Sequence, residues 1–273
     1  MSKDYDKPKM SVSEFNSLRD HYDLGHSRAI CALQNNDYPV LLQYGSETTE
    51  NTTAYVMLSG GIDSTTALYL ALNHGNYKEI IGIEFTYDQR PLTESQRVAQ
   101  ICQTSGINRY VINYPTANIV NADGYQCDSI KLPESNGIYY LLTHHLASQI
   151  KPPEKNQSQI IAGQIMYDWW APDYNSRTDD TFSRHKYYPQ ASPIMYGQLN
   201  SLLKRDTGGL SAIEVITPLI FFNKQQVVQI AVDTATPLEL TWSCPNSSEK
   251  PCGICSQCNE RRDAFAANNL NYD

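Results

Sequence analysis

The feature that most constrains the fold is a short apolar segment that ends in two glycines and then changes to a helical pattern. Ala54–Leu58 is an apolar run, and the loop Ser59–Ser64 that follows it reads Ser-Gly-Gly-Ile-Asp-Ser. Beyond the loop, apolar residues recur at helical spacing over Thr65–Leu72. The segment therefore predicts a buried strand, a tight turn and a helix, which together form the repeating unit of α/β folds.

The same alternation of strand and helix continues along the chain. Short segments typical of strands lie at Ile80–Phe85, Tyr110–Asn113, Gln159–Gly163 and Ile213–Thr217. Helical patterns lie at Leu92–Thr104, Ile138–Ile150 and Asn223–Thr234. The stretch Met166–Gly209 shows little period of either kind, which is typical of a binding loop, a lid or a disordered insertion. The expected fold class is α/β with a doubly wound parallel sheet.

Three parts are expected along the chain. Residues 1–53 form a polar N-terminal extension, residues 54–236 the α/β domain, and residues 237–273 a cysteine-rich C-terminal region. Within the extension, a short helix, the two strands of a hairpin and a linker are expected, in this order, at Ser11–Asp20, Arg28–Leu33, Val40–Tyr44 and Gly45–Thr53.

The loop Ser59–Ser64 has the chemistry of a phosphate site. Gly60 and Gly61 permit positive φ and let a ligand approach the backbone, because they carry no Cβ. The free N–H groups of the helix that follows favour an anion such as pyrophosphate. Asp63 could orient the loop or hold a magnesium ion. Three hydroxyl groups would add donors, those of Ser59, Ser64 and Thr65.

Two other phosphate-binding patterns, G-x-x-x-x-G-K-[ST] and G-x-G-x-x-G, are absent. Ordinary P-loop hydrolysis and dinucleotide binding therefore lose support. A glycine turn that merely joins a strand to a helix remains the structural alternative. The position of Ser-Gly-Gly-x-Asp-Ser between strand and helix favours a nucleotide site over that alternative.

Four of the seven cysteines are concentrated near the C-terminus, at Cys244, Cys252, Cys255 and Cys258. Four thiolates this close together can complete a tetrahedral shell around Zn²⁺ and leave no position for a reactive water, so the site would be structural. A redox dithiol at Cys255 and Cys258 or an iron–sulfur cluster are the alternatives. The scattered cysteines are expected to be small buried apolar residues, at Cys31, Cys102 and Cys127.

Charge and hydropathy exclude two classes of protein. A formal net charge of −8, with only 21 Lys and Arg residues, does not attract a phosphate backbone, so we expect no extended nucleic-acid surface. No run of ~18 apolar residues occurs that could span a membrane. The N-terminus lacks the apolar segment of a signal peptide, and the clustered cysteines suit a reducing compartment. We therefore expect a cytoplasmic protein.

In its strand-to-helix setting, Ser59–Ser64 matches the signature of the N-type ATP pyrophosphatases, or PP-loop enzymes. Together with the cysteine cluster, the chain resembles the 7-cyano-7-deazaguanine synthase family of queuosine precursor synthesis. The resemblance covers about residues 54–273. It is carried by Val56–Tyr69, Phe85–Arg90, Pro237–Cys244 and Pro251–Cys258.

The resemblance implies that the carboxylate of 7-carboxy-7-deazaguanine is activated as an acyl-adenylate, with release of pyrophosphate. Ammonia would then give an amide, which a second ATP dehydrates to the nitrile. The implied catalytic residues are Asp63 and Lys224, the lysine neutralising phosphate charge or else being a solvated residue at a helix start. ATP, Mg²⁺ and Zn²⁺ would be the cofactors, and a homodimer the assembly. The implied ATP-binding residues are Ser59, Gly60, Gly61, Ile62, Asp63, Ser64, Thr65, Phe85, Gln89 and Arg90.

The sequence departs from the family pattern where the deazapurine would bind. Pro133–Gly137 reads Pro-Glu-Ser-Asn-Gly, so the arginine of the usual Pro-Gly-Arg-Asn is missing. The usual Gly-x-Asn-x-x-Asp-Tyr is only partly present from Gly163 onward. Asp168 could pair with the donor edge of a guanine-like ring and Trp169 or Trp170 could stack on it, although core packing explains a tryptophan equally well.

Other functions remain open. The altered substrate region and the N-terminal extension also suit a synthase-like antiviral defence enzyme, which would join an activated 7-deazaguanine to an amine of a partner protein. A catalytically silent protein would keep the nucleotide-binding fold as a scaffold. A transfer-RNA sulfur-insertion enzyme would need a basic face, which the acidic net charge disfavours.

Overall fold

The structure, a computed structural model, describes residues 52–87, 90–113, 135–150, 157–165, 193–206, 212–220, 222–245 and 249–271. The helix and hairpin predicted for the N-terminal extension lie outside the described residues. So do three of the predicted site residues, Gln89, Asp168 and Trp169.

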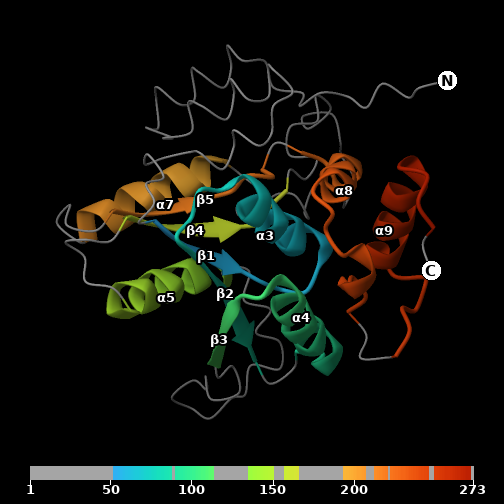
Figure 1. Cartoon of the computed structure of the whole chain (residues 1–273), viewed down its shortest axis with the longest axis horizontal. Helices are drawn as coiled ribbons and strands as arrows, with labels where there is room; N and C mark the ends of the chain where they lie inside the picture. The colour runs from blue at the N-terminus through green and yellow to red at the C-terminus, as the bar shows by residue number, and fades with distance from the viewer. Residues whose placement is uncertain are drawn as a thin grey trace, which may run out of the picture.

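A five-stranded parallel sheet forms the centre of the molecule (Figure 1). Its strands are β1 (Thr53–Met57), β2 (Glu79–Thr86), β3 (Asn108–Asn113), β4 (Gln157–Ala162) and β5 (Ala212–Ile216). Their order across the sheet is β3-β2-β1-β4-β5, and every neighbouring pair is parallel. The chain thus starts in the middle, builds one half of the sheet outward and returns to build the other half beside β1. Such a reversal opens a crevice at the carboxyl ends of the strands, where doubly wound sheets bind ligands.

Helices form a layer on each face of the sheet (Figure 1). One layer holds α3 (Ile62–His74), α4 (Leu92–Ser105), α8 (Lys224–Asp233) and α9 (Ser256–Ala267). The other holds α5 (Ser135–Ile150) and α7 (Pro193–Asp206). Successive side chains of a strand point to opposite faces, so Tyr55 packs in the second layer and Val56 in the first. The doubly wound α/β fold predicted from the sequence is confirmed.

One prediction for the chain is wrong. The stretch Met166–Gly209, expected to be irregular, contains the helix α7. Tyr196, Leu199 and Leu203 recur at helical spacing and are buried against the sheet. This apolar stripe covers only about two turns, and the Tyr-rich and Pro-rich residues before it hide the period.

The other elements predicted within the described residues are confirmed with small shifts of their ends. The helix α5, for example, begins at Ser135 rather than at Ile138. The sequence pattern does not predict α9 or the short 3₁₀ helix η6 (Leu238–Leu240). In α9 only Cys258, Ala264 and Phe265 are buried, so the helix lacks the continuous apolar stripe that makes a helix visible in a sequence.

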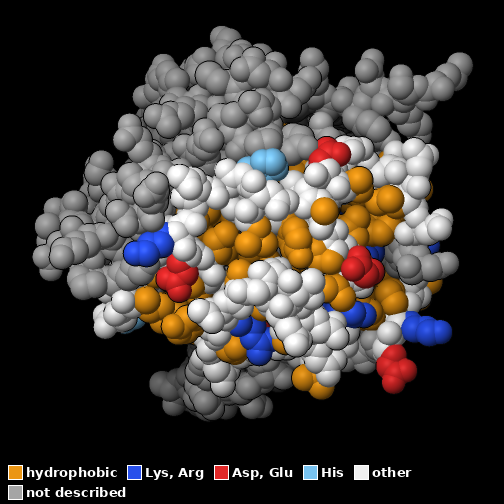
Figure 2. Space-filling view, in the orientation of Figure 1, with side chains coloured by type: hydrophobic (Ala, Val, Ile, Leu, Met, Phe, Trp, Pro, Cys, Tyr) orange, Lys and Arg blue, Asp and Glu red, His pale blue; other side chains and the backbone are white. Residues whose placement is uncertain are grey.

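Charged side chains are spread over the face that Figure 2 shows. There the Lys and Arg side chains of the described residues stand singly, with Asp, Glu and apolar side chains around them. Within the described ranges, no helix combines the length and the apolar character needed to cross a bilayer.

Candidate nucleotide and metal sites

The segment Ser59–Ser64, here called the phosphate loop, follows β1 and includes the first turn of α3, beside the crevice of the sheet. Gly60 has a φ of +85°, a left-handed conformation that favours glycine. Gly61 is the N-cap of α3 and provides no side-chain cap. In the described part of the chain, the backbone N–H groups of residues 62–64 donate to no protein acceptor. The first turn of α3 therefore offers the free donors and the positive helix end that an anion requires.

The hydroxyl groups expected to contact phosphate form hydrogen bonds within the loop. The Oγ atoms of Ser59 and Ser64 lie 3.0 Å apart, and Ser64 Oγ also donates to the carbonyl of Gly61 at 3.2 Å. Thr65 Oγ1 donates to the same carbonyl at 2.8 Å. These bonds keep the turn compact. Contact between the hydroxyl groups and phosphate stays a prediction.

The two expected catalytic residues lie together at the start of their helices. Lys224 Nζ is 2.8 Å from Oδ1 and 2.6 Å from Oδ2 of Asp63. Lys224 is the first residue of α8, and Asn223 caps this helix in a capping box with Gln226. The side chains of the pair are 15% and 22% exposed, so solvent and ligands can reach them. An ammonium group and a carboxylate beside the free N–H groups of α3 can together bind phosphates and a divalent cation.

The end of β4 packs directly against the start of α3. A Cβ added at Gly163 would lie 2.5 Å from the carbonyl carbon and oxygen of Asp63, and 2.6 Å from the Cα of Ser64. Any side chain at this position would therefore push the phosphate loop away. The sequence pattern places a glycine here, and the packing explains why the position requires one.

Arg90, expected to bind ATP, contacts the loop from the protein interior. Its side chain is 5% exposed, and Nη2 donates to the carbonyl of Ser59 at 2.9 Å. Its Nη1 atom donates to Glu84 at 2.9 Å and to the carbonyl of Phe85. Glu84 is fully buried and also pairs with Arg109 at 3.2 Å. These contacts make Arg90 a tether of the loop, while its contact with ATP stays a prediction.

Phe85, another expected ATP ligand, lies near the end of β2. Its ring stacks on Tyr139 of α5, with the ring centroids 4.3 Å apart and an interplanar angle of 24°. The side chain is 7% exposed and belongs to the hydrophobic core between the sheet and α5. A contact between Phe85 and the adenine base stays a prediction.

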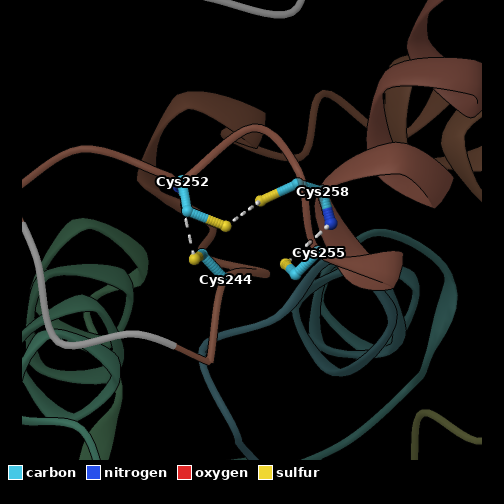
Figure 3. Close-up of side chains that lie close together, drawn as sticks. All are labelled: Cys244, Cys252, Cys255 and Cys258. Atoms are coloured by element: carbon cyan, nitrogen blue, oxygen red, sulfur yellow. Dashed lines mark hydrogen bonds between the residues drawn. The ribbon is translucent and has the colours of Figure 1, made fainter.

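The four cysteines of the C-terminal region converge (Figure 3). Their Sγ atoms all lie within 4.8 Å of one another, and those of Cys252 and Cys258 are 3.9 Å apart. Zn–S bonds of about 2.3 Å in a tetrahedron separate the sulfur atoms by about 3.8 Å, so the donor set and its spacing fit a single bound ion. An iron–sulfur cluster, whose cysteines bind different irons, requires a wider set of sulfur atoms. The predicted cysteine site is thus assembled, and it could bind a metal.

Backbone N–H groups stabilise the thiolate form in part of this cluster. The N–H groups of Ile254 and Cys255 lower the pKa of the Cys252 thiol to about 6, whereas burial raises the pKa of the Cys255 thiol to about 11. The N–H group of Cys252 donates to Cys244 Sγ, and that of Cys258 donates to Cys255 Sγ, both at 3.4 Å. A metal ion would replace the remaining thiol protons, because only the thiolate binds strongly.

Two residues at the site were not predicted from the sequence. Glu84 is a buried carboxylate in a strand, and its role as the partner of Arg90 depends on a contact that no short motif reveals. Trp242 donates its backbone N–H to the carbonyl of Gly60 at 2.8 Å. A backbone hydrogen bond leaves no mark in the sequence, although the run Thr241-Trp242-Ser243-Cys244 stood out as part of the family resemblance.

Comparisons with known proteins agree with this architecture. The model of the family described as queuosine biosynthesis protein QueC matches residues 53–144 and 181–269. The 7-cyano-7-deazaguanine synthase of Nautilia profundicola is 30% identical over 230 residues, which cover 78% of this chain and 92% of that protein. The synthase of Marinomonas sp. is 27% identical over 219 residues, which cover 78% and 93%.

A solved structure supports the fold independently. NMN synthetase from Francisella tularensis superimposes with a TM-score of 0.50 at 14% identity, covering 86% of this chain and 87% of that one. At this identity the likeness concerns the fold alone. The family match extends over more than half of the chain and includes both the phosphate loop and the four cysteines. This chain therefore belongs to the family of queuosine biosynthesis protein QueC.

Proposed function

We propose that this chain is an ATP-dependent carbon–nitrogen ligase that converts 7-carboxy-7-deazaguanine into 7-cyano-7-deazaguanine. The observation that carries the proposal is the first turn of α3, whose free N–H groups lie beside Asp63 and Lys224. The relatives named 7-cyano-7-deazaguanine synthase support the choice of product. A carboxylate reacts with an amine only after its oxygen has become part of a good leaving group, which adenylation provides.

In the proposed reaction, the carboxylate oxygen bonds to the α phosphorus of ATP, and the bond from that phosphorus to pyrophosphate breaks. Ammonia bonds to the acyl carbon and loses a proton while AMP leaves, which gives the amide. A second ATP adenylates the amide oxygen with release of pyrophosphate and a proton. Loss of AMP and of the last N–H proton then leaves the nitrile.

The predicted site residues have proposed roles in this reaction. The N–H groups of residues 62–64 hold the departing pyrophosphate, and Lys224 neutralises its charge. The carboxylate of Asp63 is partly exposed and fits a magnesium ion, which would bring the phosphates of ATP to the loop. For the deazapurine we propose Asp168 as the partner of its donor edge and Trp169 as a stacking surface.

The cysteine cluster is proposed to hold Zn²⁺ as a structural ion. Four thiolates fill its shell, so no position remains at which the ion could activate water. We further propose that the protein acts as a homodimer in the cytoplasm. Sedimentation of the purified protein would measure the first of these two properties.

A product assay tests the function. The purified protein, with ATP, Mg²⁺, ammonium and 7-carboxy-7-deazaguanine, should yield the nitrile, AMP and pyrophosphate, detected by mass spectrometry. The variant Asp63→Asn should bind ATP–Mg²⁺ weakly and form no AMP. If the wild-type protein stopped at the amide, nitrile formation would be excluded. If AMP never appeared, adenylation itself would be excluded.

One observation favours a second candidate function, in which an amine of a partner protein, and not ammonia, accepts the activated acyl group. The family match is interrupted between residues 144 and 181, the segment that contains Asp168 and Trp169. A changed substrate side suits a relative that joins the activated 7-deazaguanine to an amine of a partner protein, as in antiviral defence. Intact-mass analysis of proteins co-expressed with this chain would then show one partner heavier by the deazaguanine acyl group. Unchanged partner masses, with nitrile formed in the product assay, would exclude this acceptor.

A further inference from the structure

The segment Thr241–Cys244, here called the strap, connects the cysteine cluster to the phosphate loop. It runs from the end of η6 to the first cysteine of the cluster. At its centre, Trp242 donates its backbone N–H to the carbonyl of Gly60 at 2.8 Å. A Cβ added at Gly61 would lie 3.6 Å from the carbonyl oxygen of Trp242. The backbones of the strap and the loop are therefore in direct contact.

The strap is fixed on the side of the cysteine cluster. The indole Nε1 of Trp242 donates to the carbonyl of Cys244 at 2.6 Å, and the side chain is 5% exposed. The guanidinium of Arg97 lies over the indole ring at 5.9 Å. Arg261 of α9 donates to Thr241 Oγ1 at 2.7 Å. The position of Trp242 thus depends on the same segment that carries the cysteines.

Holding the carbonyl of Gly60 also orients the next N–H group. In a planar trans peptide the C=O of one residue and the N–H of the next point in opposite directions. The bond to Trp242 therefore sets the direction of the Gly61 N–H, which donates to Ser59 Oγ at 3.3 Å, and the bond from Arg90 to Ser59 sets the direction of the Gly60 N–H. Without such bonds, Gly60 and Gly61 could adopt many conformations, because glycine has little steric restriction.

We propose that Trp242 is a positioning residue through which the cysteine cluster sets the affinity of the phosphate loop for the pyrophosphate part of a nucleotide. The proposal rests on the nucleotide binding proposed above. With the cluster intact, the strap holds the Gly60–Gly61 peptide in the orientation that an anion needs. With the cluster opened, the strap is released, and part of the binding free energy of each nucleotide is used to order the loop. The nucleotide then binds more weakly.

Thermodynamic linkage allows a test on the native protein. If the cluster strengthens nucleotide binding, a nucleotide must strengthen metal binding by the same factor. Saturating α,β-methylene-ATP with Mg²⁺ should therefore raise the affinity of the cluster for its metal, measured at equilibrium in competition with a chromogenic chelator, by about tenfold. AMP, which lacks the β and γ phosphates, should leave the metal affinity unchanged. Equal metal affinities with and without the ATP analogue would overturn the proposal.

Three variants distinguish the effect of the strap on nucleotide affinity from a general loss of stability. Trp242→Phe removes the indole bond to Cys244, Trp242→Ala removes the ring but keeps the N–H, and Trp242→Pro removes the N–H as well. Thr241 has an extended ψ of 148°, which suits a proline after it. Relative to Trp242→Ala, Trp242→Pro should bind the ATP analogue and inorganic pyrophosphate about tenfold more weakly, with equal metal content and unchanged affinity for AMP.

The outcomes distinguish the two proposals. A wild-type protein that bound neither the ATP analogue nor pyrophosphate would contradict the proposed function. A wild-type protein that bound both, with the same affinities in Trp242→Ala and Trp242→Pro, would contradict only the role of the strap. An equal loss of affinity for AMP and for the ATP analogue would show a general disturbance of the fold and would also count against it. If Trp242→Pro did not fold, the measurement of metal affinity on the wild-type protein would decide.

Discussion

The phosphate loop and the cysteine loop are built alike but held differently. Each contains a glycine with positive φ, Gly60 in one and Gly253 in the other, and each leads into the N-terminus of a helix. The cysteine loop, residues 244–258, is stabilised from within, since its four sulfur atoms and the backbone N–H groups that donate to them come from one short segment. The phosphate loop has hydrogen bonds of its own between Ser59, Gly61, Ser64 and Thr65, but it also depends on distant residues, namely Arg90, Trp242 and Gly163.

This difference has a functional meaning. A cluster that is closed by its own ligands suits an ion that binds once and stays. Arg90 and Trp242 hold the phosphate loop through the carbonyl groups of Ser59 and Gly60. The N–H groups of residues 62–64, which have no acceptor among the described residues, are left for a ligand that must enter and leave. The two loops should therefore respond differently to substitution: the cysteine loop through stability, and the phosphate loop mainly through affinity.

The largest effect is expected for Cys244→Ser. This cysteine is fully buried and is one of four sulfur atoms in the cluster. Its loss should abolish stoichiometric metal binding and lower the free energy of unfolding by roughly 4 kcal/mol or more. Metal analysis and thermal denaturation would measure both. The matched control is Cys102→Ser, a buried cysteine of α4 outside the cluster, which should keep the metal.

Substitution of Arg90 should show the effect of the phosphate loop, with a change in nucleotide affinity as well as in stability. Arg90→Ala leaves the buried Glu84 with Arg109 as its remaining cation, and should lower stability by about 3 kcal/mol. Arg90→Lys keeps the charge but cannot form the several hydrogen bonds of a guanidinium. Compared with Arg90→Ala, Arg90→Lys should recover much of the stability, as measured by denaturation. It should recover little of the nucleotide affinity, as measured by calorimetry.

A matched control for Arg90 is available in Arg109→Ala. Arg109 also pairs with Glu84, but it is 30% exposed and none of its described contacts reaches the phosphate loop. Its loss should lower stability slightly and leave nucleotide affinity unchanged. If Arg109→Ala weakened nucleotide binding as much as Arg90→Lys, the tether from Arg90 to Ser59 would not explain the effect.

The sequence predicted the cysteine cluster more completely than the contacts of the phosphate loop, because a sequence pattern shows local spacing and not contacts between distant segments. All four cysteines lie in one segment, so their spacing alone predicted the cluster. The pattern of the phosphate loop predicted its turn, and family resemblance named Asp63 and Lys224 as catalytic residues, but their ion pair, between positions 161 apart in the sequence, was not predicted. The tethers could not be predicted. Their bonds use the backbone carbonyls of Ser59 and Gly60, which every residue type possesses.

Gly163→Ala tests packing against the loop with a single methyl group. The added Cβ would clash with the backbone of Asp63 and Ser64 at 2.5 to 2.6 Å, and backbone cannot rotate away as a side chain can. We expect a loss of about 1–3 kcal/mol of stability together with weaker nucleotide binding. Gly137→Ala is the control, because nothing lies within 4 Å of its new Cβ and the position is helical. That variant should be slightly more stable.

The smallest effect is expected for Asn223→Ala. The Asn223 side chain accepts the N–H of Gln226 at 2.9 Å and caps α8 directly before Lys224. Its loss should cost about 1 kcal/mol of stability, and Asn223→Ser, which retains a capping oxygen, should recover most of it. Nucleotide affinity should hardly change, because two short contacts to Asp63 hold the ammonium of Lys224 independently of the cap. A loss of affinity as large as that of Arg90→Lys would instead place the start of α8 among the tethers of the phosphate loop.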